Sequence, residues 1–314
     1  MAGCFQGVEM NKTSGPLISV IVPAYYSFTT IESSLNALML QTYRDFEVIV
    51  VNSSPEEQTG RIVREGFPNV KFIQSPERLL PHAARNVGID IARGGLLVFT
   101  DPDCVADKEW LETLVGAFEG GRKAVVGSMG LAGTDWLEYG IHLCKFHPLL
   151  PGLSSSKKTC APTANAAYCR DLWESIGPFP GEVFAGDGII SWRASSLGQA
   201  PFFIPKAVVR HFHKEIFGSF CRQRFSRGRE YALVRLKLLG PPTILTWLSL
   251  VFSWAVVGWV LLRAGKNAIS AGWGRMFFLT LPVQLAGHLM WALGESFEAV
   301  GILFRTGFAG GRDA

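Results

Sequence analysis

The sequence predicts an α/β fold with a mainly parallel sheet that has helices on both of its faces. Short runs of β-branched and aliphatic residues recur through residues 17–127, and a stretch with helical spacing follows most of them. Strands and helices that alternate in this way are typical of parallel sheets. The runs are almost entirely apolar, which indicates strands that are buried on both faces.

Each element follows from its own residues. The run Leu-Ile-Ser-Val-Ile-Val at 17–22 ends at Pro23, and the run Phe-Glu-Val-Ile-Val-Val at 46–51 ends in an Asn-Ser-Ser-Pro turn. Both are typical of short buried strands. Further strands are expected at 70–73, 95–100 and 124–127. Helices are expected at 30–41, 57–65, 82–92 and 110–118.

Polar residues directly follow two of these strands. Asn52 follows the second strand, and Asp101-Pro102-Asp103 follows the fourth. In open α/β sheets, ligands bind at the carboxyl ends of the strands. Two carboxylates one residue apart can hold a hard divalent cation such as Mg²⁺ or Mn²⁺ together with phosphate oxygens. The alternative for the pair alone is an ordinary solvated turn.

Charge and hydropathy divide the chain into two unlike parts. The whole chain is 48% hydrophobic and only 18% charged. Residues 1–205 contain 16 Lys or Arg against 21 Asp or Glu, a net charge of −5, whereas residues 206–314 contain 14 against 5, a net charge of +9. A basic, apolar second part is typical of a segment that lies on an anionic membrane.

Residues 238–304 are expected to form a membrane-associated helical segment with one or two transmembrane helices. Residues 238–262 include no charged side chain, and about 20 apolar residues span a bilayer. Residues 276–294 are also uncharged but contain Gln284 and His288. The alternative for the first stretch is a buried core helix, and for the second it is a helix that lies in the membrane interface.

Three features bear on location and partners. The six cysteines are scattered without a Cys-x-x-Cys pair, which is typical of a reducing compartment and argues against a structural zinc site. Residues 1–16 lack the apolar core of a signal peptide. We therefore expect the catalytic domain on the cytoplasmic side of an inner or plasma membrane. No nucleic-acid-binding module accompanies the basic residues, so nucleic acid is not an expected partner.

Four segments occur in the order of a known enzyme family: LISVIVPAY at 17–25, FEVIVVNSS at 46–54, HAARNVGIDIARGGLLVFTDPD at 82–103, and FAGDGIISWRASSLGQAPFFIPKAVVRHFH at 184–213. The chain resembles glycosyltransferase family 2 over residues 16–230. The resemblance implies the Rossmann-like GT-A fold. It also implies an inverting transfer of a sugar from a nucleotide-diphosphate donor to a hydroxyl group, with a divalent metal and an Asp general base. The hydrophobic C-terminus favours a glycan or lipid-linked acceptor of the cell envelope.

The resemblance implies a donor site at the start of the chain. Pro23-Ala24-Tyr25 matches the nucleotide-binding turn of the family. The next donor position is usually an Asp that contacts the base, and here it is Asn52. An Asn carbonyl can still accept a hydrogen bond from a pyrimidine N3–H. The departure leaves the identity of the nucleotide open.

Further donor residues follow from the same resemblance. Arg85 and Asn86 match the Ala-Arg-Asn stretch near the donor, with Asp101 beside them. A planar guanidinium suits either a phosphate or a carboxylate, so the alternative for Arg85 is a structural ion pair with Asp101. Arg224 and Arg227 lie in a basic stretch that could close over the diphosphate or rest on lipid headgroups.

The catalytic base is expected to be Asp187. Alignment on Ser191-Trp192-Arg193 places Asp187 at the Asp of the family's Glu-Asp pair and Gly186 at the Glu. One carboxylate suffices for general-base catalysis if it reaches the acceptor hydroxyl. The alternative is that Asp187 only caps the following helix, since Asp is a favoured N-cap.

The resemblance also assigns a metal site and an acceptor side. Asp101 and Asp103 are the expected metal ligands, together with His211 or, less well matched, His213. Alternate positions on an extended segment face the same side, so either His could reach the metal. The expected acceptor-side residues are Asn165 and Trp192.

Two other classes share part of this pattern. A nucleotidyltransferase also uses paired carboxylates and a metal, but it would have a Gly-rich basic loop near the first strand, and residues 17–31 contain no Gly, Lys or Arg. A membrane or scaffold protein that kept the fold and lost activity would account for the departures at Asn52 and Gly186.

Overall fold

The computed structural model describes residues 17–237 and 243–309, and it divides the chain into two compact units. The first unit comprises residues up to Ala132 together with Leu149–Phe212. The second comprises Gly133–Pro148 and the residues from His213 onward. This division differs from the expected one, because residues 213–230 belong with the C-terminal helices.

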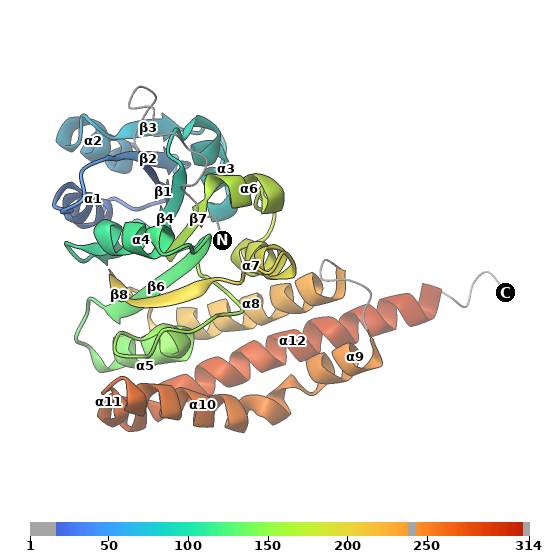
Figure 1. The fold of residues 1–314 in the computed structure, drawn as a ribbon. Helices are drawn as coiled ribbons and strands as arrows, with labels where there is room; N and C mark the ends of the chain where they lie inside the picture. Colours follow the sequence, from blue (N-terminus) through green and yellow to red (C-terminus); the bar gives the residue numbers. More distant parts are fainter. Residues whose placement is uncertain (1–16, 238–242, 310–314) are drawn as a thin grey trace. The chain divides into compact units, whose positions relative to one another are not determined.

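The first unit is built on one eight-stranded sheet with the strand order β3-β2-β1-β4-β7-β6-β8-β5 (Figure 1). Its strands are β1 (Ile18–Ala24), β2 (Phe46–Asn52), β3 (Lys71–Gln74), β4 (Leu96–Thr100), β5 (Cys104–Ala106), β6 (Ala124–Leu131), β7 (Asn165–Cys169) and β8 (Phe202–His211). Its helices are α1 (Ile31–Met39), α2 (Glu57–Gly66), α3 (Pro81–Ile91), α4 (Trp110–Glu119), α6 (Arg170–Ile176) and α7 (Gly186–Ser196).

The sheet is mixed, and only its N-terminal part is uniformly parallel. Strands β3, β2, β1 and β4 pair in parallel, as do β6 and β8. Strand β7 runs antiparallel to both of its neighbours, and β5 runs antiparallel to β8. The expectation of a mainly parallel sheet therefore holds for the alternating strand–helix part, whereas beyond β4 the pairing is mixed and only β6 and β8 are parallel.

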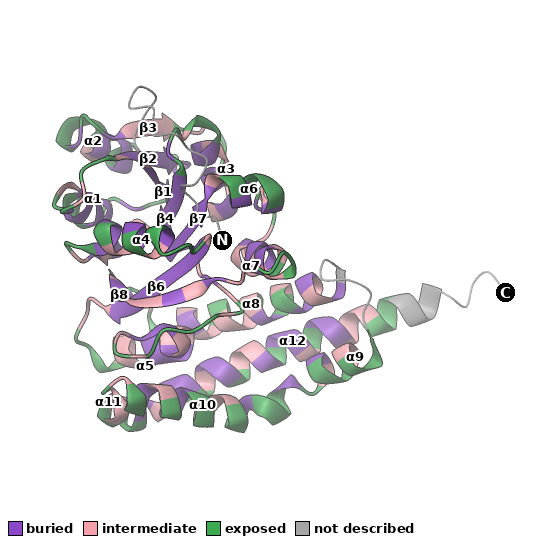
Figure 2. Cartoon of the chain, viewed as in Figure 1, coloured by how far each residue is buried: buried purple, intermediate pink, exposed green. Residues whose placement is uncertain are grey.

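The core of this unit lies on both faces of the sheet. Every residue of β1 and of β4 is buried, and Figure 2 shows these strands in purple. The apolar runs of the sequence are continuous for this reason, since helices cover both faces of a doubly wound sheet. The helices at 30–41, 57–65, 82–92 and 110–118 are confirmed as α1 to α4, with ends that differ by a few residues.

The second unit is helical. Its elements are α5 (Trp136–Phe146), η1 (His147–Leu149), α8 (Phe217–Lys237), α9 (Ile244–Val251), η2 (Ser253–Val256), α10 (Val257–Ser270), α11 (Gly274–Leu279) and α12 (Leu281–Ala309). Helices α8 and α12 approach closely where glycines face the other backbone. A Cβ on Gly228 would lie 2.0 Å from the carbonyl oxygen of Trp291, and one on Gly294 would lie 2.1 Å from that of Phe225.

The prediction of transmembrane helices is not confirmed by the helices of this unit. Within 17–237 and 243–309, no helix taken singly has the length and apolar character needed to cross a bilayer. Helix α9 and the helical stretch Ser253–Ser270 satisfy the requirement only as a pair, and they are bent by 73° at the break between them. Residues 238–242, the start of the first expected span, lie outside the described residues.

The second expected span, 276–294, is divided between α11 and the start of α12. Helix α12 carries two buried carboxylates, Glu295 and Glu298. Arg229 of α8 pairs with Glu298 at 2.8 Å. Arg229 thus balances the buried charge of Glu298 within the unit.

One cysteine departs from the expectation of free thiols in a reducing compartment. Cys169, at the end of β7, is disulfide-bonded. Four cysteines are free thiols in the described part of the chain: Cys104, Cys144, Cys160 and Cys221. The cysteine pattern therefore does not support a fully reduced chain.

Candidate functional site

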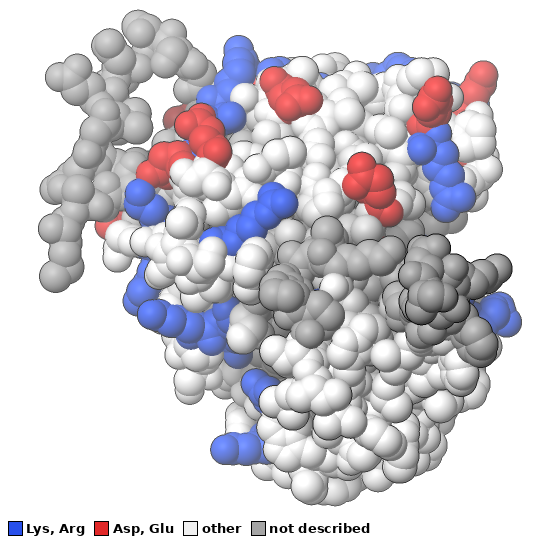
Figure 3. Space-filling model, turned by 90° about the vertical axis from the view of Figure 1, so that its right-hand side faces the viewer, with Lys and Arg blue, Asp and Glu red and all other residues white. Residues whose placement is uncertain are grey.

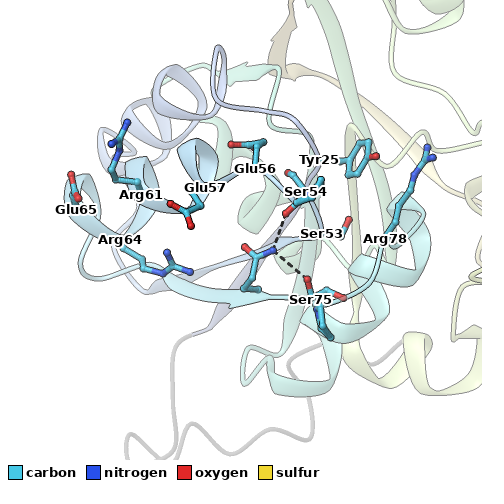
Figure 4. A pocket seen from close by; sticks show the side chains of 14 residues that line it. Tyr25, Ser53, Ser54, Glu56, Glu57, Arg61, Arg64, Glu65, Ser75 and Arg78 are labelled. Atoms are coloured by element: carbon cyan, nitrogen blue, oxygen red, sulfur yellow. Dashed lines mark hydrogen bonds between the residues drawn. The ribbon is translucent and has the colours of Figure 1, made fainter.

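A cleft of about 740 Å³ opens at the carboxyl ends of β2 and β3 (Figure 4). The turn after β1, helix α2 and the segment after β3 surround it. Its lining residues are Tyr25, Ser53, Ser54, Pro55, Glu56, Glu57, Gly60, Arg61, Arg64, Glu65, Gln74, Ser75, Pro76 and Arg78. This is the edge of the sheet at which ligands of doubly wound folds bind.

The turn after β1 is held in a strained conformation beside this cleft. Tyr26 has a φ of 49°, which is uncommon for a residue with a side chain. Its N–H donates to the Ser54 hydroxyl at 2.8 Å, and the Ser53 N–H donates to the Ala24 carbonyl at 3.0 Å. Such strain persists where the surroundings fix it, and it concentrates at ligand sites.

All three residues of the predicted nucleotide-binding turn, Pro23, Ala24 and Tyr25, line a second cavity of about 110 Å³. This cavity shares Tyr25, Ser53 and Arg78 with the large cleft. The structure thus brings the predicted turn to the cleft.

Asn52 lies beneath the cleft and is fully buried. Its Oδ1 accepts from the Ser54 hydroxyl at 2.6 Å, and its Nδ2 donates to Gln74 Oε1 at 2.9 Å. Gln74 Nε2 in turn donates to the carbonyls of Ser54 and Ser75, and dashed lines in Figure 4 end at these two serines. Asn52 thus positions Ser54 and Gln74, which line the cleft, and contact of Asn52 itself with the base stays a prediction.

The cleft carries charges of both signs. Burial alone would raise the pKa of Glu56, but hydrogen bonds from Thr59 and Ser54 lower it, so this carboxylate stays ionised. The Arg78 guanidinium lies over the Tyr25 ring at 4.8 Å, and Arg64 lies over the Phe72 ring at 4.6 Å. A ligand with hydrogen-bond donors and acceptors and a flat apolar face has partners of each kind here.

Side chains of helix α3 contact the residue after β4 and the segment before α7. Arg85 is buried and pairs with Asp101 at the end of β4. His82, one turn earlier, donates from Nε2 to the Phe184 carbonyl at 2.9 Å. The ion pair is the structural alternative stated for Arg85, and contact of Arg85 with a donor stays a prediction.

Two asparagines of the predicted site, Asn86 and Asn165, form hydrogen bonds within the protein. The Asn86 amide donates to the Phe179 carbonyl at 2.9 Å and accepts from the Phe179 N–H at 3.1 Å. Asn165 is fully buried, donates to the carbonyls of Ser128 and Ala207, and accepts from the Trp110 indole. Asn86 fixes the segment before α7, and contact of Asn165 with an acceptor stays a prediction.

A group of metal-ligand side chains lies where β5 meets β8. In the described residues, Asp103, Cys104 and His211 bring an oxygen, a sulfur and a nitrogen within 4.8 Å of one another. His211 Nε2 lies 3.6 Å from Asp103 Oδ2. Burial raises the pKa of the Cys104 thiol, and the charges of Asp103 and Asp101 raise it further. Asp101 lies outside this group, so its part in metal binding stays a prediction.

Asp187 lies in the first turn of α7 and is half-buried. The N-cap is Ala185, and Asp187 Oδ1 accepts from the Gly188 N–H at 2.8 Å. Burial raises the pKa of the nearby Cys160 thiol, and the charge of Asp187 adds to this rise. Trp192, on the same helix, is 45% exposed. Neither the catalytic part of Asp187 nor an acceptor contact of Trp192 is tested by this geometry.

The glycine at the family's Glu position has a structural reason. A Cβ on Gly186 would lie 2.7 Å from His82 Cδ2 and 3.1 Å from its Nε2. The His82 ring cannot move away easily, because it stacks on Phe179 with 4.6 Å between ring centroids. His82 therefore occupies the space that a side chain at position 186 would need.

Gly186→Ala is expected to destabilise the chain by about 1–3 kcal/mol, the usual cost of overpacking. Gly188→Ala is the matched control, because a Cβ there meets no atom within 4 Å, and removing a helical glycine gains roughly 0.5–1 kcal/mol. Urea unfolding midpoints measure both changes. Equal midpoints for the two variants would contradict the close packing of Gly186 on His82.

Three predicted residues lie in the helical unit. Arg224 and Arg227 belong to the regular helix α8, and not to a loop. Arg224 donates to the Gly287 carbonyl at 3.3 Å and lies over the Trp291 ring, while Arg227 pairs with Glu230. His213 lies 3.1 Å from His142, between their ring nitrogens. Of the two candidate histidines, His211 is thus the one beside Asp103.

The first unit is also similar to known proteins. A family model described as Glycosyl transferase family 2 matches residues 19–177, about half of the chain. The chain belongs to glycosyltransferase family 2. It is 30% identical to glycosyltransferase AglE of Haloferax volcanii over 222 residues, which cover 68% of this chain and 72% of the relative. It is 27% identical to the probable glycosyltransferase YdaM of Bacillus subtilis, over 72% of this chain and 58% of that protein.

Solved structures of other glycosyltransferases have the same fold. A mannosyltransferase from Pyrobaculum calidifontis, in complex with GDP-Man and Mn²⁺, superposes with a TM-score of 0.54 at 20% identity and covers 86% of each chain. TarS of S. aureus superposes with a TM-score of 0.52 at 21% identity, over 70% of this chain and 40% of that one. The family 2 chain therefore has a GT-A-like mixed α/β fold and is a glycosyltransferase.

Several residues of this family 2 site were not expected from sequence. Gln74 ends β3 just as Asn52 ends β2, so the rule that ligands bind at the ends of strands could have found it. Cys104 directly follows the predicted Asp101–Asp103 pair, but a single Cys gives no signal by itself. His82 acts through contacts across the fold, which no local pattern reveals.

Proposed function

We propose that this family 2 enzyme transfers a sugar from a nucleotide-diphosphate donor to a hydroxyl acceptor with inversion at the anomeric carbon. The observation that carries the proposal is the grouping of Asp103 and His211 in the same sheet whose carboxyl edge forms the large cleft. The volume of the cleft is sufficient for a nucleoside, and a cation held by Asp103 and His211 would neutralise the charge of a diphosphate. Both are requirements of a metal-dependent transferase.

The metal-ligand side chains of Asp103 and His211 fit a divalent cation such as Mn²⁺ or Mg²⁺. A carboxylate and an imidazole that lie 3.6 Å apart, with their strands fixed by pairing between β5 and β8, need little movement to share one ion. Asp103 and His211 would hold it. The bound cation would supply positive charge to the departing diphosphate.

Asp187 is proposed as the general base. Its carboxylate accepts the proton of the acceptor hydroxyl while the oxygen attacks the anomeric carbon. The new C–O bond forms on the face opposite the diphosphate as the bond to the diphosphate breaks, so the configuration inverts. Arg85 keeps Asp101 in place at the end of β4 through their ion pair.

The nucleoside is proposed to occupy the large cleft. Ser54 and Gln74 supply neutral hydrogen-bonding groups, and Tyr25 and Arg78 supply a flat surface at its rim. This arrangement replaces the acidic base contact that is usual in the family.

A panel of nucleotide sugars tests this function. Full-length protein in detergent should release a nucleoside diphosphate from one of them, and chelation of divalent metal should stop the release. Readdition of Mn²⁺ or Mg²⁺ should restore it. Release that continues unchanged in chelator would contradict the metal-dependent mechanism, and cleavage to a nucleoside monophosphate would favour nucleotidyl chemistry.

The helical unit is proposed to contact an anionic membrane from the cytoplasmic side, with a lipid-linked or envelope glycan as acceptor. Large apolar side chains of α9 and α10 are exposed, including Ile244 at 76% and Leu262 at 75%. Figure 3 shows a broad area without charged side chains in the lower part of the view. Arg263 and Lys266 are exposed on α10 beside Leu262. Apolar and basic groups together favour the surface of an anionic bilayer.

The double variant Ile244→Glu and Leu262→Glu is expected to lower the fraction of protein that floats with phosphatidylglycerol-containing vesicles severalfold. The matched control is Leu40→Glu, an exposed leucine of the first unit. Equal flotation of the double variant and the control would contradict membrane contact through α9 and α10.

A further inference from the structure

We propose that Cys104 is a third protein ligand of the metal at Asp103 and His211, and that its sulfur makes the site favour borderline cations over Mg²⁺. This proposal rests on the proposed metal-dependent transfer. It adds a ligand and a metal preference that the Asp-x-Asp pattern does not contain.

Strand pairing brings the thiol to the metal group. Strand β5 runs antiparallel to β8, and Cys104 lies directly opposite His211 in the register. Residues directly opposite each other in an antiparallel pair place their side chains on the same face. The position of Cys104 beside the imidazole is therefore set by the backbone.

The backbone of Asp103, directly before β5, is held next to the same two strands. The Phe212 N–H donates to the Asp103 carbonyl at 2.9 Å, and the Cys104 N–H donates to the Asp101 carbonyl at 3.1 Å. These bonds fix the backbone of Asp103 on both sides. The three side chains therefore come from a rigid part of the sheet, as a specific metal site requires.

The spacing of the three ligand atoms suits one ion. Cys104 Sγ lies 3.8 Å from Asp103 Oδ1, and His211 Nε2 lies 3.6 Å from Asp103 Oδ2. With metal bonds of about 2.0 Å to nitrogen and oxygen and about 2.3 Å to sulfur, tetrahedral ligand atoms lie roughly 3.3–3.5 Å apart. The two separations from Asp103 exceed this by a few tenths of an ångström, and the ligand atoms of all three residues lie within 4.8 Å of one another.

The chemistry of sulfur gives the site a preference. Mg²⁺ takes oxygen ligands almost exclusively, whereas Co²⁺ and Zn²⁺ bind thiolate and imidazole well. Coordination replaces the proton of the Cys104 thiol, and that proton leaves to solvent. A site with one oxygen, one nitrogen and one sulfur ligand from the protein disfavours Mg²⁺ and accepts Mn²⁺, Co²⁺ or Zn²⁺ in that rising order of affinity.

Cobalt loading of the full-length protein tests the sulfur ligand directly. The Co²⁺ protein should show a thiolate-to-cobalt charge-transfer band in the near ultraviolet. Cys104→Ser should lose the band and weaken Co²⁺ binding by at least the roughly 10–100-fold that loss of an outer-shell partner costs. The matched control is Cys221→Ser, a free thiol of the helical unit, which should keep the band.

A second measurement needs no variant. Zinc-edge X-ray absorption of the wild-type protein loaded with one equivalent of Zn²⁺ should show one sulfur at about 2.3 Å. Binding of Co²⁺ or Zn²⁺ without sulfur would overturn the role of Cys104 and leave the metal-dependent transferase intact. Failure of any divalent cation to bind would overturn both, and the chelation experiment would then also show no metal dependence.

Discussion

Asp187→Asn is expected to lower the rate of sugar transfer by roughly 10²–10⁴-fold, the range that general-base catalysis supplies. The amide cannot accept the proton of the acceptor hydroxyl, although it fills the same space. Asp187 lies in the first turn of α7, and its Oδ1 accepts one backbone N–H that an amide oxygen can also bind. The fold should therefore survive the change.

The measurement is the initial rate of nucleoside diphosphate release in the presence of acceptor, with donor affinity determined separately by calorimetry. Glu182→Gln is the matched control, because Glu182 is an exposed acid in the segment before α7. The control should keep the wild-type rate, and both variants should keep the wild-type donor affinity. An unchanged rate for Asp187→Asn would remove Asp187 from the mechanism.

Asp103→Asn is expected to lower transfer by about 10³-fold or more, because charge stabilisation by a bound metal is worth several kcal/mol. The amide is a poor ligand for a hard cation, and the loss should not be repaired by a higher concentration of donor. Rates across a series of Mn²⁺ concentrations measure the effect. The variant should respond to Mn²⁺ only at much higher concentrations than the wild type.

Asp107→Asn provides the comparison for this variant. Asp107 follows β5 closely and pairs with Arg210 at the surface. Exposed ion pairs contribute little to stability, so this variant should fold and transfer sugar normally. Equal loss of activity in both variants would indicate damage to the edge of the sheet and would contradict a specific role of Asp103.

The sequence alone predicts the N-terminal half of the sheet well. Runs such as 17–22 and 46–51 are buried on both faces, so they are apolar throughout. The positions of these strands can therefore be predicted from the sequence. Strand β5 is only three residues long, and β7 begins with a buried Asn. Such short strands depend on pairing with β8 and β4, which local sequence does not report.

The residues of the candidate site also differ in how well the sequence predicts them. Positions at the ends of long strands, such as Asp101 and the Pro23-Ala24-Tyr25 turn, are predictable because the sheet sets their place. Asn52 and Asn165 were assigned to ligands but are buried with their amides bonded inside the protein. A buried polar group needs partners, and whether these are protein or ligand depends on the tertiary structure.

The C-terminal part illustrates a different limit. A spanning helix, an interfacial helix and a buried core helix can have the same apolar composition, so composition alone does not distinguish them. The bend of 73° after α9 and the ion pair between Arg229 and Glu298 are tertiary features that composition does not contain. Exposed residues such as Trp259, at 62%, keep the membrane proposal open to experiment.

The most direct test of the central claim is calorimetric titration of UDP and of GDP into the wild-type protein and Asp103→Asn, with and without Mn²⁺. We expect Mn²⁺ to strengthen binding of one of the two nucleotides to the wild-type protein at least about tenfold, a gain of roughly 1.4 kcal/mol. Asp103→Asn should show no such gain. Equal affinities with and without Mn²⁺ in the wild-type protein would contradict a metal-dependent nucleotide-sugar site at Asp103 and His211.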